Sequence, residues 1–438
     1  MKYDVIVAGA GPAGLMAAKT AAEDGLKVLL LERKKDITEI GRLCGQWTSI
    51  NFSVAGEPLK KYGYLEPIAL EVGTDQIKVH FPALGFAINY NGPIRPYMRW
   101  IHFSPSGFRV HREKEGTVFG FFWEKESLLG GLLSEAQKAG AEVWTETVAL
   151  GAENTKDGVT VKARTRGGEQ TLEAKWVIAA DGTGSRIVES LGLNAKRKVL
   201  GSPDSGGGVV GYVLEGIQSE YRLNAWLQFT IPELCRPNLW MFMVAGDRNV
   251  LGTVGAKADI IDKFMKLPFY EPWFRNAKIV KRMATSMGTI RTPILEPVAG
   301  NVLIAGDAAA FIEVTNPGAI ACGYQAAKAT LKELSGQKGY PEYVKWWQKS
   351  FETNLPEYPK IAARFYAING ICSNEEIDYL YRLVQDQLGL PGLLIARSMN
   401  RIKSERPDLY GKLKKAGIDE KLAEMKIGLF EAMGMQKE

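Results

Sequence analysis

Three glycines and a carboxylate near the N-terminus have the types and spacing needed to hold the phosphates and ribose of a dinucleotide. The pattern Gly-x-Gly-x-x-Gly occupies six consecutive positions: Gly9, Ala10, Gly11, Pro12, Ala13 and Gly14. In such a turn the first glycine allows the bend, the second lets the backbone approach a pyrophosphate, and the third lets the next helix pack closely. Glu32 ends the next apolar run, where it can accept hydrogen bonds from ribose hydroxyls. This favours an unphosphorylated ribose, although Arg33 beside it weakens the preference.

Two distant segments also carry an acid at the end of an apolar run. Trp176–Ala180 continues into Asp181-Gly182, and Val302–Ala305 continues into Gly306-Asp307. A cofactor with two nucleotide halves, such as FAD, is extended and needs a second carboxylate far from Glu32. The alternative is that each aspartate only caps a turn.

These three segments, in this order, resemble the group of FAD proteins typified by the aromatic hydroxylases. The resemblance implies that Asp307 binds a ribityl hydroxyl, that Asp181-Gly182 line the cofactor, and that Val148 stands where backbone binds adenine. Lys125 stands where the group usually has an arginine, and it keeps the charge without the bidentate fork. A helix start would direct its N–H groups and dipole at the flavin, and its residues are Pro317, Gly318, Ala319 and Ile320. We therefore predict that the chain binds FAD.

A short segment beyond Glu32 indicates which flavoprotein this is. Arg42, Cys44 and Gly45 form an Arg-x-Cys-Gly pattern. It resembles the geranylgeranyl reductase family, which saturates isolated C=C bonds of isoprenoid chains, over roughly residues 1 to 370. The resemblance implies that reduced FAD delivers a hydride to one alkene carbon and that an acid or water protonates the other. Cys44 is the candidate for a group beside the reacting carbon, and its alternative role is that of a small buried hydrophobe.

The substrate signature of that family, P-x-x-Y-x-W-x-F-P, is only partly present. Trp240 and Phe242 match it as substrate-binding candidates, whereas Cys235, Asn238 and Met243 replace its Pro, Tyr and Pro. This departure leaves the exact substrate open. Aromatic residues are dense between residues 80 and 123, and we expect most of them to form the core of a sheet rather than a tunnel wall. The same region contains the three histidines, which we expect to be structural: His80, His102 and His111.

The pattern of apolar runs predicts an α/β protein with a Rossmann-like FAD-binding domain, a mixed antiparallel-sheet substrate domain and a helical C-terminal region. We expect the FAD-binding domain to be discontinuous, at 1–75, 120–200 and 285–335. The substrate domain would comprise 76–119 and 201–284, and the helical domain 336–438. Helices are expected over 15–24, 127–139 and 317–334. Separate strands are expected over 169–174 and 176–180.

Composition excludes several classes of protein. The net charge of +6 comes without a long Lys/Arg block, so we predict no nucleic-acid partner. The four cysteines are scattered without a C-x-x-C pair, which argues against a metal site, an iron–sulfur cluster or a disulfide framework. The N-terminus enters a strand directly, and no apolar run reaches the roughly 18 residues of a membrane span. A cytoplasmic location is expected, with peripheral contact to a membrane left open.

Two other functions remain open from the sequence. One is an aromatic hydroxylase or halogenase-type monooxygenase of the same fold, and the other is a flavoprotein that carries electrons to a quinone. The substrate is expected to be an apolar small molecule or lipid. No second Gly-x-Gly-x-x-Gly for NAD(P)H is present, so a ferredoxin or another small carrier is as suitable an electron donor as NAD(P)H.

Overall fold

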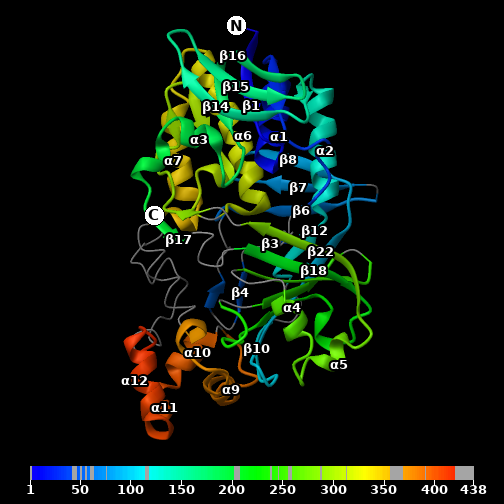
Figure 1. Cartoon of the computed structure of the whole chain (residues 1–438), viewed down its shortest axis with the longest axis vertical. Coiled ribbons are helices and arrows are strands. Elements are labelled where there is room, and N and C mark those ends of the chain that lie inside the picture. The colour runs from blue at the N-terminus through cyan, green and yellow to red at the C-terminus, as the bar shows by residue number, and fades with distance from the viewer. Residues whose placement is uncertain are drawn as a thin grey trace.

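The computed structural model describes most of the chain (Figure 1). The described residues are 2–41, 47–49, 52–54, 57–59, 64–74, 76–113, 118–201, 208–236, 239–244, 246–254, 259–286, 289–311, 313–355, 368–389 and 391–419.

An eight-stranded sheet forms the body that contains the N-terminus (Figure 1). Its parallel part has the order β13-β2-β1-β16-β25, and the hairpin β14-β15 continues antiparallel from the first half of β16. The strands are β1 (Tyr3–Ala8), β2 (Val28–Leu31), β13 (Glu142–Trp144), β14 (Val148–Asn154), β15 (Val159–Thr165), β16 (Gly168–Ala179), β24 (Val298–Ala299) and β25 (Val302–Ile304). Strands β2 and β25 are buried throughout, as expected of parallel strands covered on both faces. The two strands expected at 169–174 and 176–180 are a single strand, because no turn residue separates them.

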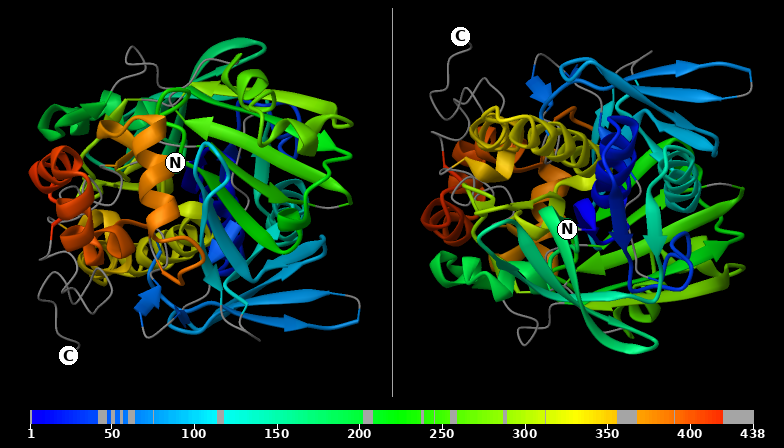
Figure 2. Two further views of the ribbon diagram at one scale, coloured as in Figure 1. Left: turned by 90° about the horizontal axis from the view of Figure 1, so that it is seen from below. Right: turned by 90° about the horizontal axis from the view of Figure 1, so that it is seen from above.

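Three helices pack together on this sheet: α1 (Pro12–Glu23), α2 (Lys125–Lys138) and α6 (Thr315–Leu334). Seen from above, α1 lies between α6 and α2 (Figure 2). The contact with α6 is very close, because a Cβ on Gly323 would lie 2.1 Å from the Ala13 carbonyl oxygen. The next helix, α7 (Tyr340–Ser350), adds Tyr343 and Trp347 to the same hydrophobic core. A short helix, α3 (Arg186–Ser190), follows β16.

A seven-stranded sheet forms the second body, in the order β11-β10-β19-β20-β21-β18-β22. All neighbours are antiparallel except β10 and β19, so the sheet is mixed as predicted. Its strands are β10 (Arg99–Phe103), β11 (Arg109–Glu113), β18 (Gly208–Glu215), β19 (Ala225–Phe229), β20 (Leu239–Met243), β21 (Arg248–Val254) and β22 (Lys278–Ser286). One face packs against α4 (Asp259–Phe264) and α5 (Glu271–Phe274). The other face carries aromatic rings that pack against the three-stranded sheet of β3 (Trp47–Ser49), β12 (Gly120–Trp123) and β9 (Ile94–Tyr97).

Three small sheets complete the strands. They are formed by β4 (Phe52–Val54) with β5 (Glu57–Leu59), by β6 (Ala69–Val72), β7 (Ile77–Phe81) and β8 (Phe86–Tyr90), and by β17 (Val199–Gly201) with β23 (Ile290–Arg291). The sheet of β6 to β8 contributes Val79, Phe81 and Ile88 to the core of the first body.

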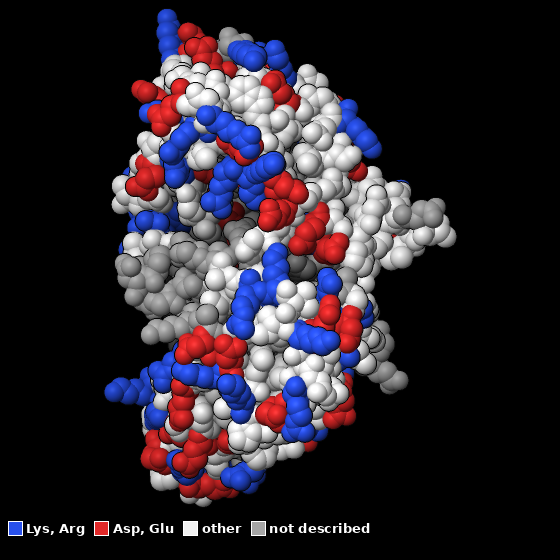
Figure 3. All heavy atoms as spheres, turned by 45° about the vertical axis from the view of Figure 1, so that its right-hand side comes forward, with Lys and Arg blue, Asp and Glu red and all other residues white. Residues whose placement is uncertain are grey.

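The C-terminal helices lie at the end of the molecule opposite the N-terminus (Figure 1). They are α9 (Asn374–Leu383), α10 (Pro391–Arg397), α11 (Met399–Glu405) and α12 (Pro407–Lys415). They form a hydrophobic core of their own, to which β11 adds Val110, and Ser373 with Glu376 caps the first of them. The division of the chain into three domains stays a prediction. On the face drawn in Figure 3, basic and acidic side chains are interspersed. None of the helices in the described part of the chain has the length and apolar composition needed to cross a membrane.

Candidate active site

The glycine-rich turn between β1 and α1 is fixed by backbone contacts that leave no room for a side chain at two of its three glycines. Gly9 has φ +94°, and a Cβ there would lie 2.5 Å from the Ala180 carbonyl oxygen. A Cβ on Gly14 would lie 1.7 Å from the Gly9 carbonyl oxygen. A Cβ on Gly11 would meet nothing within 4 Å. The outer two glycines are therefore required by packing, and the central one leaves open space above the start of α1, where a pyrophosphate would lie.

Glu32 ties this turn to the end of β2. Its buried carboxylate accepts hydrogen bonds from Ala10 N at 2.7 Å and Lys34 N at 2.9 Å. Its carbonyl oxygen accepts from Thr147 N at 2.8 Å, which brings Val148 to the same edge of the sheet. The Arg33 side chain is exposed, so the structure brings Glu32 and Val148 to the turn and directs Arg33 toward solvent.

The two distant aspartates come to the same place. Asp181 follows β16, and its Cα would lie 2.8 Å from a Cβ on Gly9. Its Oδ2 accepts from Arg186 N at 3.0 Å, while its Oδ1 is shielded from water and has no hydrogen-bond partner. This shielding raises the pKa of the Asp181 carboxyl. Gly182 follows with φ +83°.

Gly306 and Asp307 approach α1 from the end of β25. Gly306 has φ +67°, and a Cβ there would lie 3.1 Å from the Ala13 Cβ. Asp307 Oδ1 accepts from Val314 N at 2.9 Å. The three segments that were predicted from sequence to share a cofactor therefore converge around the first turn of α1.

The start of α6 is buried at all four positions that were predicted to face the cofactor: Pro317, Gly318, Ala319 and Ile320. The first N–H groups of a helix have no partner inside the helix, so this end offers donors and positive dipole. Gly318 also has a packing reason, because a Cβ there would lie 2.7 Å from the Phe351 ring. Thr315 has φ +62°, which is rare for a β-branched residue and strains the backbone at this helix start.

Lys125 is buried at the first position of α2. Its neighbour Glu124 is held in place, since its N–H donates to the Tyr90 hydroxyl at 2.8 Å and its carboxylate accepts from the Ser127 hydroxyl. A buried lysine at a helix start is a suitable partner for an anionic cofactor.

These groups fit an extended dinucleotide. The open space at Gly11, the buried carboxylate of Glu32, the unpartnered Oδ1 of Asp181 and the start of α6 supply contacts along its length. Among the described residues, no group of three or more His, Cys, Asp or Glu side chains could hold a metal ion.

The face of the seven-stranded sheet that turns toward the first body carries stacked rings. Phe242 is buried and stacks on Phe122 of β12 with 4.4 Å between ring centroids. Trp226 stacks on Phe242 at 5.2 Å and on Trp240 at 5.9 Å. Both sequence candidates, Trp240 and Phe242, therefore lie on one face with Trp226 between them and β10.

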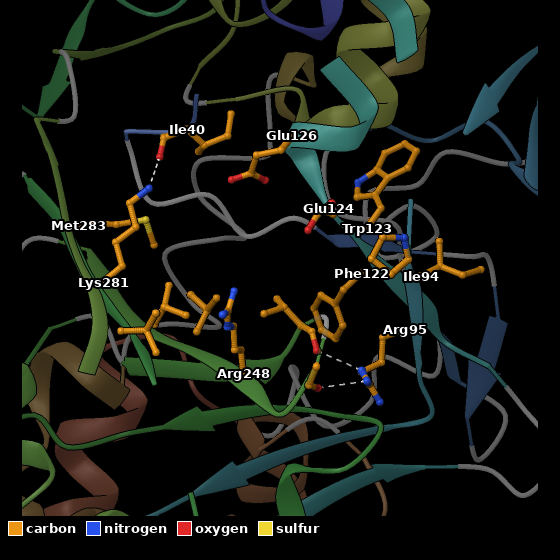
Figure 4. Close-up of a pocket in the computed structure, with 16 residues that line it drawn as sticks. Ile40, Ile94, Arg95, Phe122, Trp123, Glu124, Glu126, Arg248, Lys281 and Met283 are labelled. Carbon is orange, nitrogen blue, oxygen red and sulfur yellow. Dashed lines mark hydrogen bonds between the residues drawn. The ribbon is translucent and has the colours of Figure 1, made fainter. Parts of the chain in front are cut away.

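A cavity of about 320 Å³ continues this face toward β22 (Figure 4). Its apolar lining consists of Ile40, Pro93, Ile94, Phe122, Trp123, Val213, Val244, Val250, Val280 and Met283. Its charged lining consists of Arg95, Glu124, Glu126, Arg248 and Lys281. Sequence reasoning missed these charged residues, because they come from separate strands and one helix start, and no local pattern connects them.

Comparison with known proteins identifies the family. Residues 4–49 match the family described as FAD dependent oxidoreductase, and residues 124–205 match the FAD binding domain. A digeranylgeranylglycerophospholipid reductase of Methanosarcina acetivorans is 30% identical over 351 residues, which cover 77% of this chain and 75% of that protein. The chain belongs to the geranylgeranyl reductase family. It is an FAD-dependent oxidoreductase, and its cofactor is FAD.

A second relative supports the family, and a solved structure supports the fold. A digeranylgeranylglycerophospholipid reductase of Methanocaldococcus jannaschii is 26% identical over 418 residues, which cover 93% of this chain and 96% of that protein. The crystal structure of a geranylgeranyl bacteriochlorophyll reductase-like protein from Thermoplasma acidophilum superposes with a TM-score of 0.63 at 20% identity, covering 94% and 99% of the two chains. The latter likeness concerns the fold, which is the predicted FAD-binding α/β fold.

Three residues that carried the resemblance to the geranylgeranyl reductase family, Arg42, Cys44 and Gly45, lie outside the described residues, as does Asn238. The segment that leads to them is held by β22, because Lys281 Nζ donates to the Ile40 carbonyl oxygen at 2.8 Å. The other three cysteines, Cys235, Cys322 and Cys372, are free and buried.

The histidines of this geranylgeranyl reductase family member occupy three different environments. His80 is partly exposed and shares a hydrogen bond with Glu71 at 2.9 Å. Burial lowers the pKa of His111. His102 is buried beside Trp100, and burial together with the neighbouring Arg112 charge lowers its pKa well below the usual range. A neutral imidazole of this kind is not a reservoir of protons at neutral pH.

Proposed function

We propose that this flavoprotein saturates C=C bonds in the isoprenoid chains of a lipid. The observation that carries the proposal is the match to digeranylgeranylglycerophospholipid reductases over three quarters or more of both chains. The stacked face of Trp226, Trp240 and Phe242 supports it, because an isoprenoid chain needs an apolar wall beside the cofactor.

Bound FAD, once reduced, supplies the hydride for one alkene carbon. The chain's own part is to orient the alkene, to exclude water with its aromatic face, and to bring a proton to the other carbon. Cys44 is the proposed group beside that carbon. Each saturation consumes two electrons, which we assign to a ferredoxin or NAD(P)H, and two protons.

The test is anaerobic reoxidation of the reduced protein. The flavin is reduced with dithionite, the excess is removed, and its absorbance is followed after addition of a geranylgeranyl lipid, a quinone or an aromatic phenol. Reoxidation by the lipid, with a mass gain of two hydrogens for each saturated bond, supports the proposal. Reoxidation by the quinone alone would make the protein an electron carrier. Substrate-dependent hydroxylation in air with NAD(P)H would make it a monooxygenase.

Cys44 is tested by Cys44→Ser and Cys44→Ala in the same assay. If the thiol donates the proton, Cys44→Ala lowers turnover at least tenfold and Cys44→Ser less, while the flavin spectrum stays unchanged. Equal turnover of both variants and the wild type would assign the proton to another donor.

A further inference from the structure

The cavity between α2 and the seven-stranded sheet joins an apolar wall to two basic side chains of the sheet, Arg248 and Lys281 (Figure 4). We propose that it binds an anionic amphiphile, with the apolar part on the wall and a phosphate at Arg248 and Lys281. The inference rests on the proposed function, since an isoprenoid phospholipid is such an amphiphile, and it names the residues that would recognise the phosphate end.

Lys281 and part of the apolar wall belong to one row across the sheet. Strand register pairs Lys281 with Val213, Val213 with Val250, and Val250 with Phe242. Directly paired residues point to the same face of a sheet. The row therefore starts at a charged residue on the edge strand β22 and becomes fully apolar toward Phe242. An amphiphile, which has one charged end and an apolar chain, matches this order.

Arg248 extends the basic end. It stands two residues before Val250 on β21, so its side chain leaves the sheet on the same face. It pairs with Glu215 at 2.8 Å, and both side chains are substantially exposed. Ion pairs this exposed contribute little, so a phosphate can replace the Glu215 contact at small cost.

Lys281 is held by a neutral group, because it donates to the Ile40 carbonyl oxygen at 2.8 Å. Within the described ranges, it has no carboxylate within ion-pair distance. A carbonyl contact orients this cation without neutralising it, which leaves its charge available for an anion. Arg95 lies across the cavity from Lys281 (Figure 4), where it donates to the carbonyl oxygens of Val244 at 3.2 Å and Gly246 at 3.3 Å.

The carboxylates of the cavity oppose them. Glu124 and Glu126 come from the start of α2, across the cavity from Arg248 (Figure 4). This arrangement confines a phosphate to the sheet side. It also predicts the direction of a change in affinity: removal of the Glu126 charge reduces repulsion and therefore strengthens phosphate binding.

The edge strand provides the route into the cavity. Val280 lines the cavity and is 45% exposed. This exposed apolar residue beside the exposed Lys281 forms a mouth suited to a lipid that arrives from a bilayer with its phosphate at the rim.

The test is calorimetric titration of the FAD-loaded protein with farnesyl monophosphate and with farnesol, which share the hydrocarbon chain. The wild type should bind the monophosphate more tightly. The double variant Arg248→Ala/Lys281→Ala should weaken monophosphate binding about tenfold to a hundredfold and change farnesol binding less than about twofold. Lys263→Ala, a charge removed from α4 on the opposite face of the same sheet, should leave both affinities unchanged.

Two further variants test the apolar wall and the effect of the Glu126 charge on phosphate affinity. Val213→Trp fills the cavity and should weaken both ligands at least about tenfold, while Glu126→Gln should tighten the monophosphate about twofold to fivefold and leave farnesol unchanged. Flavin absorbance and melting temperature verify that each variant is folded. Equal monophosphate affinity in the wild type and the Arg248→Ala/Lys281→Ala variant would overturn the proposal, as would equal affinity of the wild type for both ligands.

Failure of this inference differs from failure of the proposed function. If the wild type reduces geranylgeranyl lipids and Val213→Trp does so equally well, the cavity is not the substrate site and the reductase function stands. If no alkene reoxidises the flavin while the phosphate-dependent binding pattern is present, the cavity binds an amphiphile that the protein does not reduce.

Discussion

The nucleotide end of the candidate active site and its proposed substrate end are built by different physical means. At the nucleotide end, backbone packs on backbone: Gly9 against Ala180, Gly14 against Gly9, and Gly323 against Ala13. At the substrate end, rings and aliphatic side chains pack across two sheets, with Phe122 on Phe242 as the central stack. The first arrangement tolerates only glycine at fixed positions, whereas many combinations of bulky side chains can form the second.

This difference teaches where specificity can change. FAD is the same molecule in every member of such a family, so contacts that permit no variation are suited to it. A substrate wall of side chains can be reshaped by substitution while the sheet stays intact. The replacement of Pro, Tyr and Pro by Cys235, Asn238 and Met243 falls on this variable end.

The largest effect is expected from Gly14→Ala. The new Cβ would lie 1.7 Å from the Gly9 carbonyl oxygen, so α1 must separate from the turn. We expect a loss of more than about 4 kcal/mol in the free energy of unfolding, together with loss of FAD. Urea unfolding followed by circular dichroism, and the flavin content of the purified protein, measure both.

Gly11→Ala is the matched control for Gly14→Ala. Its Cβ would meet nothing within 4 Å, so stability should change by less than about 1 kcal/mol. FAD affinity should still fall at least about tenfold, because the methyl group occupies the space over the helix start. Equal stability of the Gly14→Ala and Gly11→Ala variants would show that backbone packing does not define this end.

The next effect concerns the substrate end. Phe242→Ala should cost about 3–5 kcal/mol of unfolding free energy, as for other buried aromatic residues, and should lower alkene turnover while leaving FAD bound. The control is Phe229→Ala, a buried ring on the opposite face of the same sheet, which packs on Phe264 and Tyr270. It should cost similar stability and leave the turnover of the folded protein unchanged. Equal turnover of the two variants would contradict a substrate role for the Phe242 face.

Sequence reasoning reached further at the nucleotide end than at the substrate end, for the same physical reason. Gly9, Glu32, Asp181 and Asp307 were identifiable because their backbone geometry and strand-end position require those residue types. The parallel sheet followed from apolar runs of strand length. The expected gap between residues 174 and 176 was wrong because Lys175 continues the strand without a turn.

The cavity was beyond the reach of local patterns. Arg95, Arg248 and Lys281 lie on three strands, β9, β21 and β22, whose neighbours are set by the topology of two different sheets. An exposed lysine or arginine in a strand carries no sign of what it faces across the molecule. Cys44, which sequence alone singled out as catalytic, stays a prediction.

A smaller effect is expected at Glu32. Glu32→Gln removes the charge from a carboxylate that accepts from Ala10 N and Lys34 N, and hydrogen bonds to charged groups are worth about 1.5–3 kcal/mol. FAD affinity should therefore fall about tenfold to a hundredfold, measured by titration of the apoprotein with FAD. Glu39→Gln, an exposed carboxylate in the same segment, is the control and should bind FAD as the wild type does. If the Glu32→Gln variant binds FAD as tightly as the wild type, Glu32 does not bind the ribose of FAD.

The smallest effect is a difference in pH dependence between the two ends. Burial lowers the folded-state pKa of His102, whereas the unfolded chain takes up its proton below about pH 6.5. Stability is therefore present above that pH and falls as the pH drops below it, by up to about 1.4 kcal/mol per pH unit. The contribution of Asp181 to stability changes with pH in the opposite direction. Its raised pKa means that the folded state holds a proton that the unfolded chain releases above its ordinary value of 3.8, so its contribution grows as the pH falls.

Urea unfolding at several pH values between about 4.5 and 7.5 separates the two contributions. His102→Gln should flatten the loss of stability below about pH 6.5, and Asp181→Asn should steepen it, because each variant removes one of two opposed proton linkages. The control is His80→Gln, which removes a partly exposed imidazole on the sheet of β6 to β8 and leaves the buried one in place. If His102→Gln and His80→Gln have the same pH profile, the imidazole of His102 is not shielded, and the stacked face is more open to water than the packing of Trp100 and Trp226 implies.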